Sequence, residues 1–104
     1  MSYCPDTKKN YEKIYHLTQK ENISLIAMQY PMRDVSQLKK MLTSFKDIIF
    51  VDNEINFKNA VTQNGYDKYF TDMFAGDFGH ATAEGNRLLA ENVAQTILKE
   101  VFRK

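Results

Sequence analysis

The chain has 104 residues, which suffice for one modest hydrophobic core but not for two independent domains. Hydrophobic residues make up 43% and charged residues 26%, as in ordinary globular proteins, and a formal net charge of +1 gives no strong field to attract nucleic acid or an anionic membrane. The single cysteine, Cys4, excludes an intramolecular disulfide and a cysteine-based metal site. No cofactor, metal, nucleic-acid partner or membrane span is therefore predicted, and the localisation stays open.

The chain begins with a helical pattern followed by a strand pattern. Apolar side chains recur at three- and four-residue spacing over residues 5–20, so we expect a helix there, with Asp6 as its cap. The nearly continuous apolar run at residues 23–30 predicts a short strand covered on both faces. Pro31 ends this strand.

A second helix and strand repeat the same order. Asp34 or Ser36 can cap a helix that runs to about residue 45 with its apolar residues on one face. Residues 48–51, IIFV, predict a second buried strand. Because a parallel return needs a crossover connection, this alternation predicts an α/β fold with helix, sheet and helix layers.

Two buried strands alone make a poor sheet, since each exposes a backbone edge and a hydrophobic face. We therefore expect further strands to come from residues upstream of Met1 or from another copy of the chain.

The second half of the chain predicts two more helices with a loop between them. Residues 55–63 suit a helix that ends at Asn64-Gly65, and residues 66–74 form a loop rich in aromatic side chains. Thr82 is the expected N-cap of the final helix. That helix carries its main apolar row at Leu89, Val93, Ile97 and Val101.

Candidate catalytic residues lie in the turn that leads into the final helix. Asp77 and His80 are three residues apart, and such a turn can hold a carboxylate against an imidazole that acts as a general base. Gly76 and Gly79 give the backbone freedom to bend there. On residue types alone, an Asp and a His before a helix are more often capping or solvated loop residues.

The longer string DFGHATAEGNRLLAENVA, residues 77–94, closely resembles the last conserved block of SGNH (GDSL-type) hydrolases. In that block, D-x-x-H is followed by a turn of small residues, a Gly and a helix. The resemblance implies a flavodoxin-like α/β fold, with His80 as the general base and Asp77 as the carboxylate that orients it. The order of strands and helices before the block is also similar, so the resemblance covers residues 1–104 as the C-terminal part of one SGNH hydrolase-like domain.

The chain departs from the family upstream of this block. The family's Gly-Asp-Ser nucleophile block, its second-block Gly and its Gly-x-Asn-Asp block are missing, and the glycines begin only at Gly65. None of the serines lies in a Gly-Asp-Ser string; they are Ser2, Ser24, Ser36 and Ser44. We expect the three blocks to lie upstream of Met1, and the chain alone to be inactive.

Other polar residues have simpler interpretations. Asp72 lies in the aromatic loop, but its spacing from His80 does not match the family turn, so we assign it to the surface. Asp52 and Asn53 follow a strand, where α/β sites collect, yet such residues more often cap the next helix. His16 is expected in solvent on the first helix, and Cys4 in a frayed terminus is not expected to react.

The aromatic loop has two interpretations of equal weight. Its side chains can line a pocket for an acyl group or a sugar, or they can seal the edge of the sheet; they are Tyr66, Tyr69, Phe70, Phe74 and Phe78.

Two functions follow from the sequence. The first is a part of a serine-type ester hydrolase that acts on a small-molecule ester. This chain would supply the catalytic His and its orienting Asp, and the upstream part of the parent chain would supply the nucleophile. The alternative is a non-catalytic α/β binding or interaction module, as a degenerate or truncated relative. The sequence does not distinguish among carbohydrate esters, lipid esters and thioesters as substrates.

Overall fold

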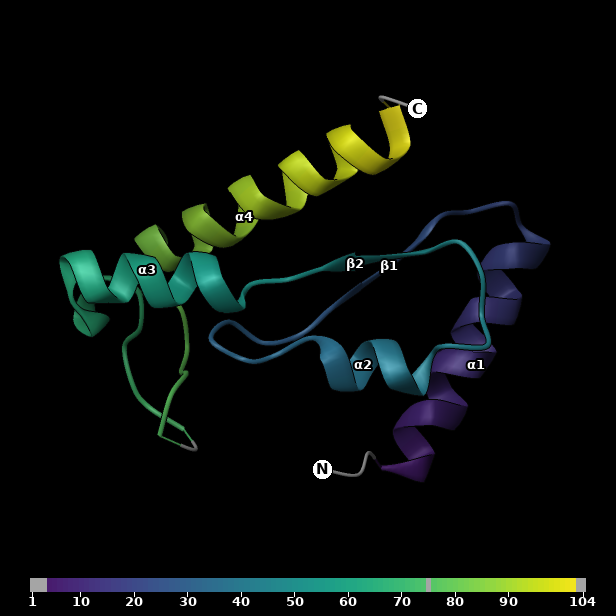
Figure 1. Ribbon diagram of the computed structural model, residues 1–104, viewed down its shortest axis with the longest axis horizontal. Helices are drawn as coiled ribbons and strands as arrows, with labels where there is room; N and C mark the ends of the chain where they lie inside the picture. Colours follow the sequence, from purple (N-terminus) through teal and green to yellow (C-terminus); the bar gives the residue numbers. More distant parts are fainter. Residues whose placement is uncertain (1–3, 75, 103–104) are drawn as a thin grey trace.

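The structure, a computed structural model, describes residues 4–74 and 76–102. It has helices and a parallel sheet, which confirms the α/β class (Figure 1). A short 3-10 turn, η1, and one π-helical turn, η2, supplement the regular elements. The order is α1 (Pro5–Lys20), β1 (Leu25–Met28), α2 (Ser36–Met41), β2 (Ile48–Val51), α3 (Glu54–Asn64), η1 (Tyr66–Lys68), α4 (Ala83–Ile97) and η2 (Leu98–Phe102).

The sheet of the described residues contains β1 and β2 paired in parallel, with Leu25 opposite Ile48 and Met28 opposite Val51. The second strand has its predicted bounds. The first is shorter than the predicted run over residues 23–30, because β2 offers only four residues to pair with.

Helices lie on both sides of the two strands. In Figure 1, α4 crosses on one side of the sheet and α2 lies on the other. One buried cluster joins α2 to the sheet, with partly buried Ile48 and Phe50 of β2 packed against it; its members are Ala27, Val35, Leu38, Met41 and Leu42. On the other side of the sheet, α4 contacts β2 (Figure 1). The two strands are therefore flanked by helices on both sides.

A second buried cluster packs α3 against the segment that follows it. Phe57 of α3, Tyr69 and Phe70 are buried, and Leu88 and Leu89 of α4 pack against them. This cluster fixes the base of the segment that carries His80.

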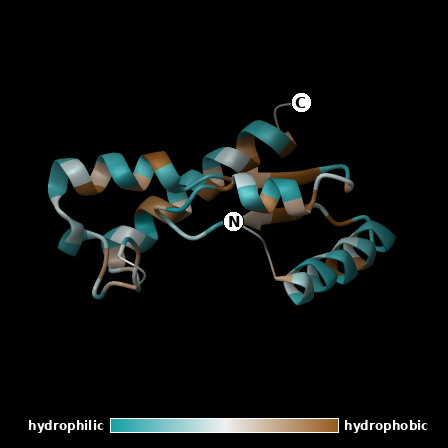
Figure 2. Cartoon of the chain, turned by 60° about the horizontal axis from the view of Figure 1, so that its bottom comes forward, coloured by the Kyte–Doolittle hydropathy of each residue, from teal (hydrophilic) through white to brown (hydrophobic). Residues whose placement is uncertain are grey.

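The N-terminal helix is the least embedded element. No residue of α1 is buried, and Ile14 and Leu17 are exposed. Figure 2 shows the strongest hydrophobic colour on the two strands, with α1 set to one end of the molecule. The helix α1 therefore leaves apolar surface exposed to solvent.

The first helix is capped differently from the prediction. Asp6 lies within the first turn, because the N-cap position is Cys4 and Pro5 takes the first helical position, where its missing N–H costs nothing.

The helix α2 is shorter than predicted, because it ends at Met41 and not at about residue 45, and its N-cap residue is Val35 without a side-chain cap. Just before this helix, Asp34 accepts a hydrogen bond from the Ser36 backbone N–H at 2.8 Å, and this bond keeps the pKa of Asp34 below its usual value.

Thr82 caps the final helix as predicted. Its hydroxyl oxygen accepts from the Gly85 backbone N–H at 3.1 Å and donates to the Lys68 carbonyl at 2.6 Å. A side chain on Gly85 would bring its Cβ within 2.2 Å of the Tyr69 carbonyl oxygen. The start of α4 is therefore pressed against the backbone of the segment before it.

Candidate functional site

The residues before α4 form an antiparallel hairpin rather than an irregular loop. Isolated bridges pair Phe70 with Ala81 and Phe74 with Phe78. Between these bridges, the Thr71 backbone N–H donates to the His80 carbonyl at 2.8 Å. Gly76 has a φ of 81° near the tip, a left-handed conformation that glycine adopts without a steric penalty.

His80 is held by the carboxylate of Asp72 on the opposite arm of this hairpin. The ring nitrogen Nδ1 lies 2.6 Å from Asp72 Oδ2, and the His80 backbone N–H donates to Asp72 Oδ1, also at 2.6 Å. An ionised carboxylate only accepts hydrogen bonds, so Nδ1 carries the proton and Nε2 of the neutral ring is left with a lone pair. Nε2 makes no hydrogen bond within residues 4–74 and 76–102. This is the arrangement that a general base requires.

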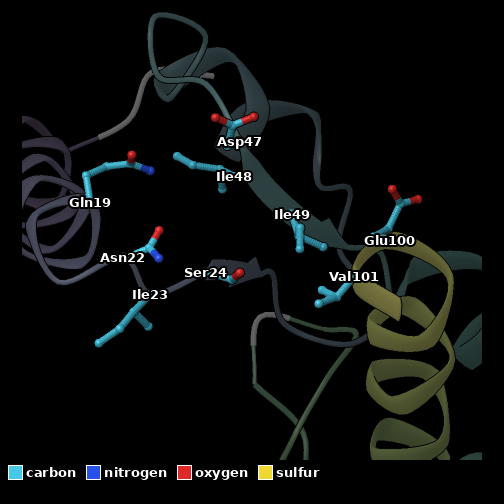
Figure 3. A pocket seen from close by; sticks show the side chains of 9 residues that line it. All are labelled: Gln19, Asn22, Ile23, Ser24, Asp47, Ile48, Ile49, Glu100 and Val101. Carbon is cyan, nitrogen blue, oxygen red and sulfur yellow. The ribbon is translucent and has the colours of Figure 1, made fainter. Parts of the chain in front are cut away.

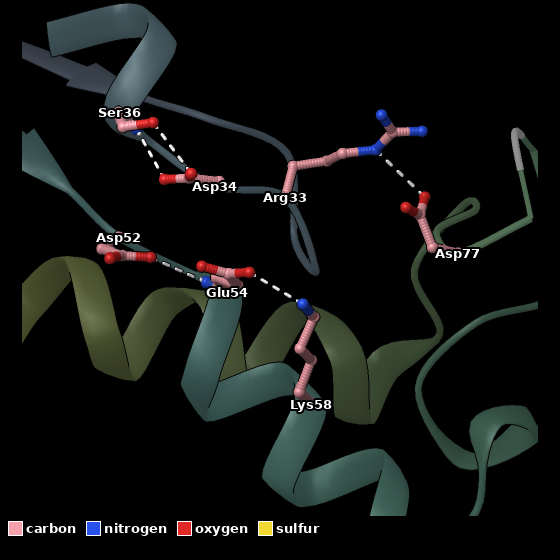
Figure 4. Close-up of polar contacts among 7 residues, drawn as sticks. All are labelled: Arg33, Asp34, Ser36, Asp52, Glu54, Lys58 and Asp77. Carbon is pink, nitrogen blue, oxygen red and sulfur yellow. Dashed lines mark hydrogen bonds and ion pairs between the residues drawn. The ribbon is translucent and has the colours of Figure 1, made fainter.

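The expected partner of His80 is elsewhere, which corrects the predicted pairing. Asp77 sits at the tip of the hairpin, where its Oδ1 accepts from Arg33 Nε at 3.1 Å (Figure 4). Asp72, which the sequence analysis assigns to the surface, takes the place against the imidazole. The physical reason is the hairpin register, which sets residue 72 on one arm opposite residues 79 and 80 on the other.

Gly79 makes this close pairing sterically feasible. A Cβ at this position would lie 1.9 Å from the Asp72 carbonyl oxygen and 2.6 Å from its Oδ1. Both distances are shorter than van der Waals contact, and one of the atoms belongs to the backbone. The glycine is therefore a sequence signal for the Asp72 contact, although only the register reveals which residue it faces.

The electrostatics of the pair favour the ionised carboxylate. Hydrogen bonds from the His80 side chain and backbone keep the pKa of Asp72 below its ordinary value. Tyr66 donates its hydroxyl to the Asp72 carbonyl at 2.6 Å. Burial, followed by the nearby charge of Asp72, raises the pKa of Tyr66, so its hydroxyl stays protonated as the donor.

The pair is open to solvent in this chain. The His80 side chain is 74% exposed and that of Asp72 is 42% exposed. A segment carrying a nucleophile could therefore approach Nε2 without displacing other parts of the chain. Phe74 meets the His80 ring edge-on at 5.2 Å and is itself exposed.

The aromatic side chains of the loop divide into a buried group and a group beside His80. Tyr69 and Phe70 are buried against Phe57, so this half of the cluster seals the core. Phe74 and Phe78 belong to the hairpin arms near His80, and Tyr66 contacts the site through its hydrogen bond to Asp72.

The polar residues at the end of β2 take structural roles. Asp52 Oδ1 accepts from the Glu54 backbone N–H at 2.9 Å at the start of α3 (Figure 4). The N-cap residue of α3 is Asn53, and its side chain makes no capping hydrogen bond. It is fully buried, and its Oδ1 accepts from Asn92 Nδ2 of α4 at 2.7 Å.

The remaining candidates do not join the pair. His16 is exposed on α1, as expected, with its ring edge-on to Phe45. Cys4 is exposed at the start of α1, where hydrogen bonds from the backbone of Thr7 and Asp6 lower the pKa of its thiol. Ser2 lies outside the described residues, and the hydroxyl of Ser36 donates to Asp34. Within the described ranges, no serine hydrogen-bonds to His80.

Hollows occur at both ends of the sheet. One of about 650 Å³ lies at the carboxyl end of β1 and is lined mainly by apolar residues that include Met28, Tyr30, Pro31 and Leu89. Another of about 340 Å³ lies at the amino ends of the strands and includes Asp47 and Glu100 on its rim (Figure 3). Ligands of α/β folds bind at the carboxyl ends of strands, where the first hollow lies, but neither His80 nor Asp72 lines it.

In the part of the chain that the structure describes, no group of three or more His, Cys, Asp and Glu side chains could hold a metal ion. None of the helices in that part is both long and apolar enough to cross a membrane. Compared with protein-family models, curated proteins and solved structures, the chain gives no match.

Proposed function

We propose that this chain is the C-terminal part of an SGNH-type ester hydrolase, in which His80 is the general base and Asp72 is the carboxylate that orients it. The observation that carries the proposal is the double contact between the two residues. One carboxylate binds both the ring and the backbone of His80 at 2.6 Å and leaves Nε2 without a hydrogen bond to any other described residue. The resemblance of residues 77–94 to the family's last block supports the same role for His80.

The reaction in the parent protein is acyl transfer. A serine hydroxyl from the upstream part attacks the ester carbonyl and gives its proton to Nε2 of His80. The imidazolium returns the proton to the leaving alcohol, and water then releases the acyl group by the same route. The negative Asp72 stabilises the imidazolium while Nδ1 keeps its proton.

The fold we propose is the flavodoxin-like fold of that family, incomplete in this chain. The parallel strands with α2 on one side and α4 on the other support it. The partner is the upstream part of the parent, whose additional strands would cover the open edges of the sheet.

Serine-directed labelling tests the proposal. The chain by itself is expected to give no hydrolysis of 4-nitrophenyl acetate above background and no labelling by a fluorophosphonate, because nucleophile and oxyanion donors each contribute orders of magnitude. The protein extended by the preceding coding sequence is expected to gain both.

Two results would contradict the proposal. Labelling of a serine within residues 1–104, with turnover, would place the nucleophile in this chain. An upstream coding sequence without a Gly-Asp-Ser block would instead favour a non-catalytic binding module.

A further inference from the structure

The tip of the hairpin is fastened to the loop between β1 and α2 by three contacts. Arg33 donates from Nε to Asp77 Oδ1 at 3.1 Å, across 44 positions of sequence (Figure 4). The guanidinium carbon of Arg33 lies 5.2 Å from the centre of the Phe78 ring. Tyr30 stacks on the same ring, with centroids 4.7 Å apart and planes at 14°.

The loop that presents Arg33 is itself anchored. The Met32 backbone N–H donates to the Asn53 carbonyl at 3.1 Å, and the Met32 side chain packs against the cluster around Phe57. The Arg33 N–H donates to the Tyr30 carbonyl at 3.2 Å, which closes the turn. Arg33 therefore extends from a segment that is tied to the end of β2 and to the core.

The residues at the tip contact the candidate base through one further side chain, Phe74. Phe78 is the bridge partner of Phe74, and the Phe74 ring meets the His80 ring at 5.2 Å. Asp72 and His80 lie on the two arms between this bridge and the base of the hairpin. Residues 71–74 of the first arm are exposed, so little burial holds that arm in place. The contacts at the tip therefore restrain the arms together with the Tyr66 bond to the Asp72 carbonyl and the backbone hydrogen bonds between the arms.

We propose that Arg33 is a positioning residue for His80, acting through Asp77 and Phe78 to keep the arm of His80 closed against Asp72. The planar guanidinium suits this task because it bonds a carboxylate with one edge while its face lies on an aromatic ring, which an ammonium group cannot do. The inference rests on the proposed function for the use of His80 as a base. The coupling itself is a property of this chain.

Amide hydrogen exchange of the chain as it stands tests the coupling. Thr71 N–H and His80 N–H are the reporters, because both donate across the hairpin. In Arg33→Ala, we expect both amides to exchange about tenfold faster, the combined effect of one ion pair and one cation–π contact. Arg33→Lys should restore only part of the protection, since it keeps the charge and loses the flat face.

A second readout separates positioning from general loosening. In Arg33→Ala, the pKa of the Asp72 carboxyl group, measured by carbon NMR, should rise toward its ordinary value because the hydrogen bonds from His80 are lost. Arg87→Ala is the matched control, because it removes an Arg Nε to carboxylate pair of 3.2 Å on the exposed face of α4. It should change neither the two amides nor the Asp72 titration.

Unchanged exchange at both amides in Arg33→Ala, with α4 amides still protected, would overturn the inference. If Arg33→Ala unfolds the chain, Asp77→Asn removes the same ion pair from the hairpin side and must accelerate the same two amides. The two proposals fail separately. If His80→Ala left the turnover of an active parent unchanged, the role of His80 as a base would be refuted and the Arg33 coupling would stand. If Arg33→Ala left the exchange of the two amides unchanged, the coupling would be refuted and the role of His80 would stand.

Discussion

The orientation of the His80 ring depends on a single carboxylate. Asp72 accepts the ring Nδ1–H and the backbone N–H of the same residue, so its protonation weakens two hydrogen bonds together. These bonds depress the pKa of Asp72 in the folded chain. Because this pKa is depressed, the two hydrogen bonds stabilise the folded chain fully at any pH above the ordinary Asp pKa of about 3.9. This stabilisation is lost as the pH falls through the lower pKa of the folded chain.

A carbon NMR titration of the Asp72 carboxyl group checks this sign. We expect its transition to lie below the ordinary carboxyl range, because both hydrogen bonds from His80 favour the ionised form. The His80 amide proton should show a transition at the same low pH, and this transition should vanish in Asp72→Asn. A carboxyl transition at or above the ordinary value, or a low-pH amide transition that survives in Asp72→Asn, would show that another group controls the ring.

Gly79 and Gly76 should respond differently to alanine. Gly79→Ala places a Cβ 1.9 Å from the Asp72 carbonyl oxygen, a backbone atom that cannot move aside, so the hairpin must open at a cost of about 1–3 kcal/mol. In Gly76→Ala the added Cβ has no atom within 4 Å, so the only cost is that of a left-handed backbone at a residue with a side chain, about 1 kcal/mol of stability. Urea unfolding, with the His80 amide shift as local probe, should show the larger loss for Gly79→Ala; the reverse order would refute the packing argument.

At the scale of elements, a hydrogen bond between a buried and a half-buried amide side chain ties α4 to the end of β2. Asn92 Nδ2 donates to Asn53 Oδ1 at 2.7 Å and to the Asp52 carbonyl at 2.8 Å. Asn53 is fully buried and its own Nδ2 has no partner, so it depends on this bond for satisfaction.

Asn92→Ala should therefore destabilise the chain by about 1–3 kcal/mol, because a buried acceptor loses its donor. Asn86→Ala, at an exposed position of the same helix, should stay within about 0.5 kcal/mol. Equal midpoints for the two variants in urea denaturation would mean that water satisfies Asn53 as well as Asn92 does.

Local pattern predicted most of these elements. The period of apolar residues in α1 and α4, the stop at Gly65 and the Thr82 cap are all properties of neighbouring residues, and each agrees with the structure. The ends of β1 could not be predicted in this way, because pairing with the four residues of β2 decides where it stops.

The hairpin shows why the site was harder to predict than the fold. The D-x-x-H spacing predicts a contact within one turn, whereas the register brings Asp72 to His80 from eight residues away. That register depends on the left-handed Gly76 and on the absence of a side chain at Gly79, and neither is visible as a periodic pattern. The ion pair of Asp77 with Arg33 spans 44 positions and leaves no local signal.

At the scale of the whole molecule, the chain is less compact than a complete domain of its length. Its radius of gyration is 14.9 Å, whereas roughly 13 Å is typical for about 100 residues. Large apolar side chains are exposed on several elements, among them Leu17, Met28, Tyr30 and Phe102. Both features fit a sheet that lacks flanking strands.

We expect the isolated chain to associate or to aggregate, because these apolar side chains and the open strand edges offer contacts to other copies. Sedimentation velocity over a range of concentrations measures this. A monomer at all concentrations, with a cooperative thermal transition, would argue that the chain is complete as it stands.

Steady-state turnover of a short-chain ester by the extended protein that includes the upstream blocks tests the central claim most directly. The account predicts that His80→Ala lowers kcat by several orders of magnitude with the fold intact, since the serine loses its proton acceptor. Asp72→Asn should lower kcat less than His80→Ala does but clearly more than Asp77→Asn does. Asp77 affects the His80 ring only through the hairpin. If Asp77→Asn were the more damaging of the two, the oriented pair would be misassigned, and if His80→Ala left kcat unchanged, His80 would not be the base.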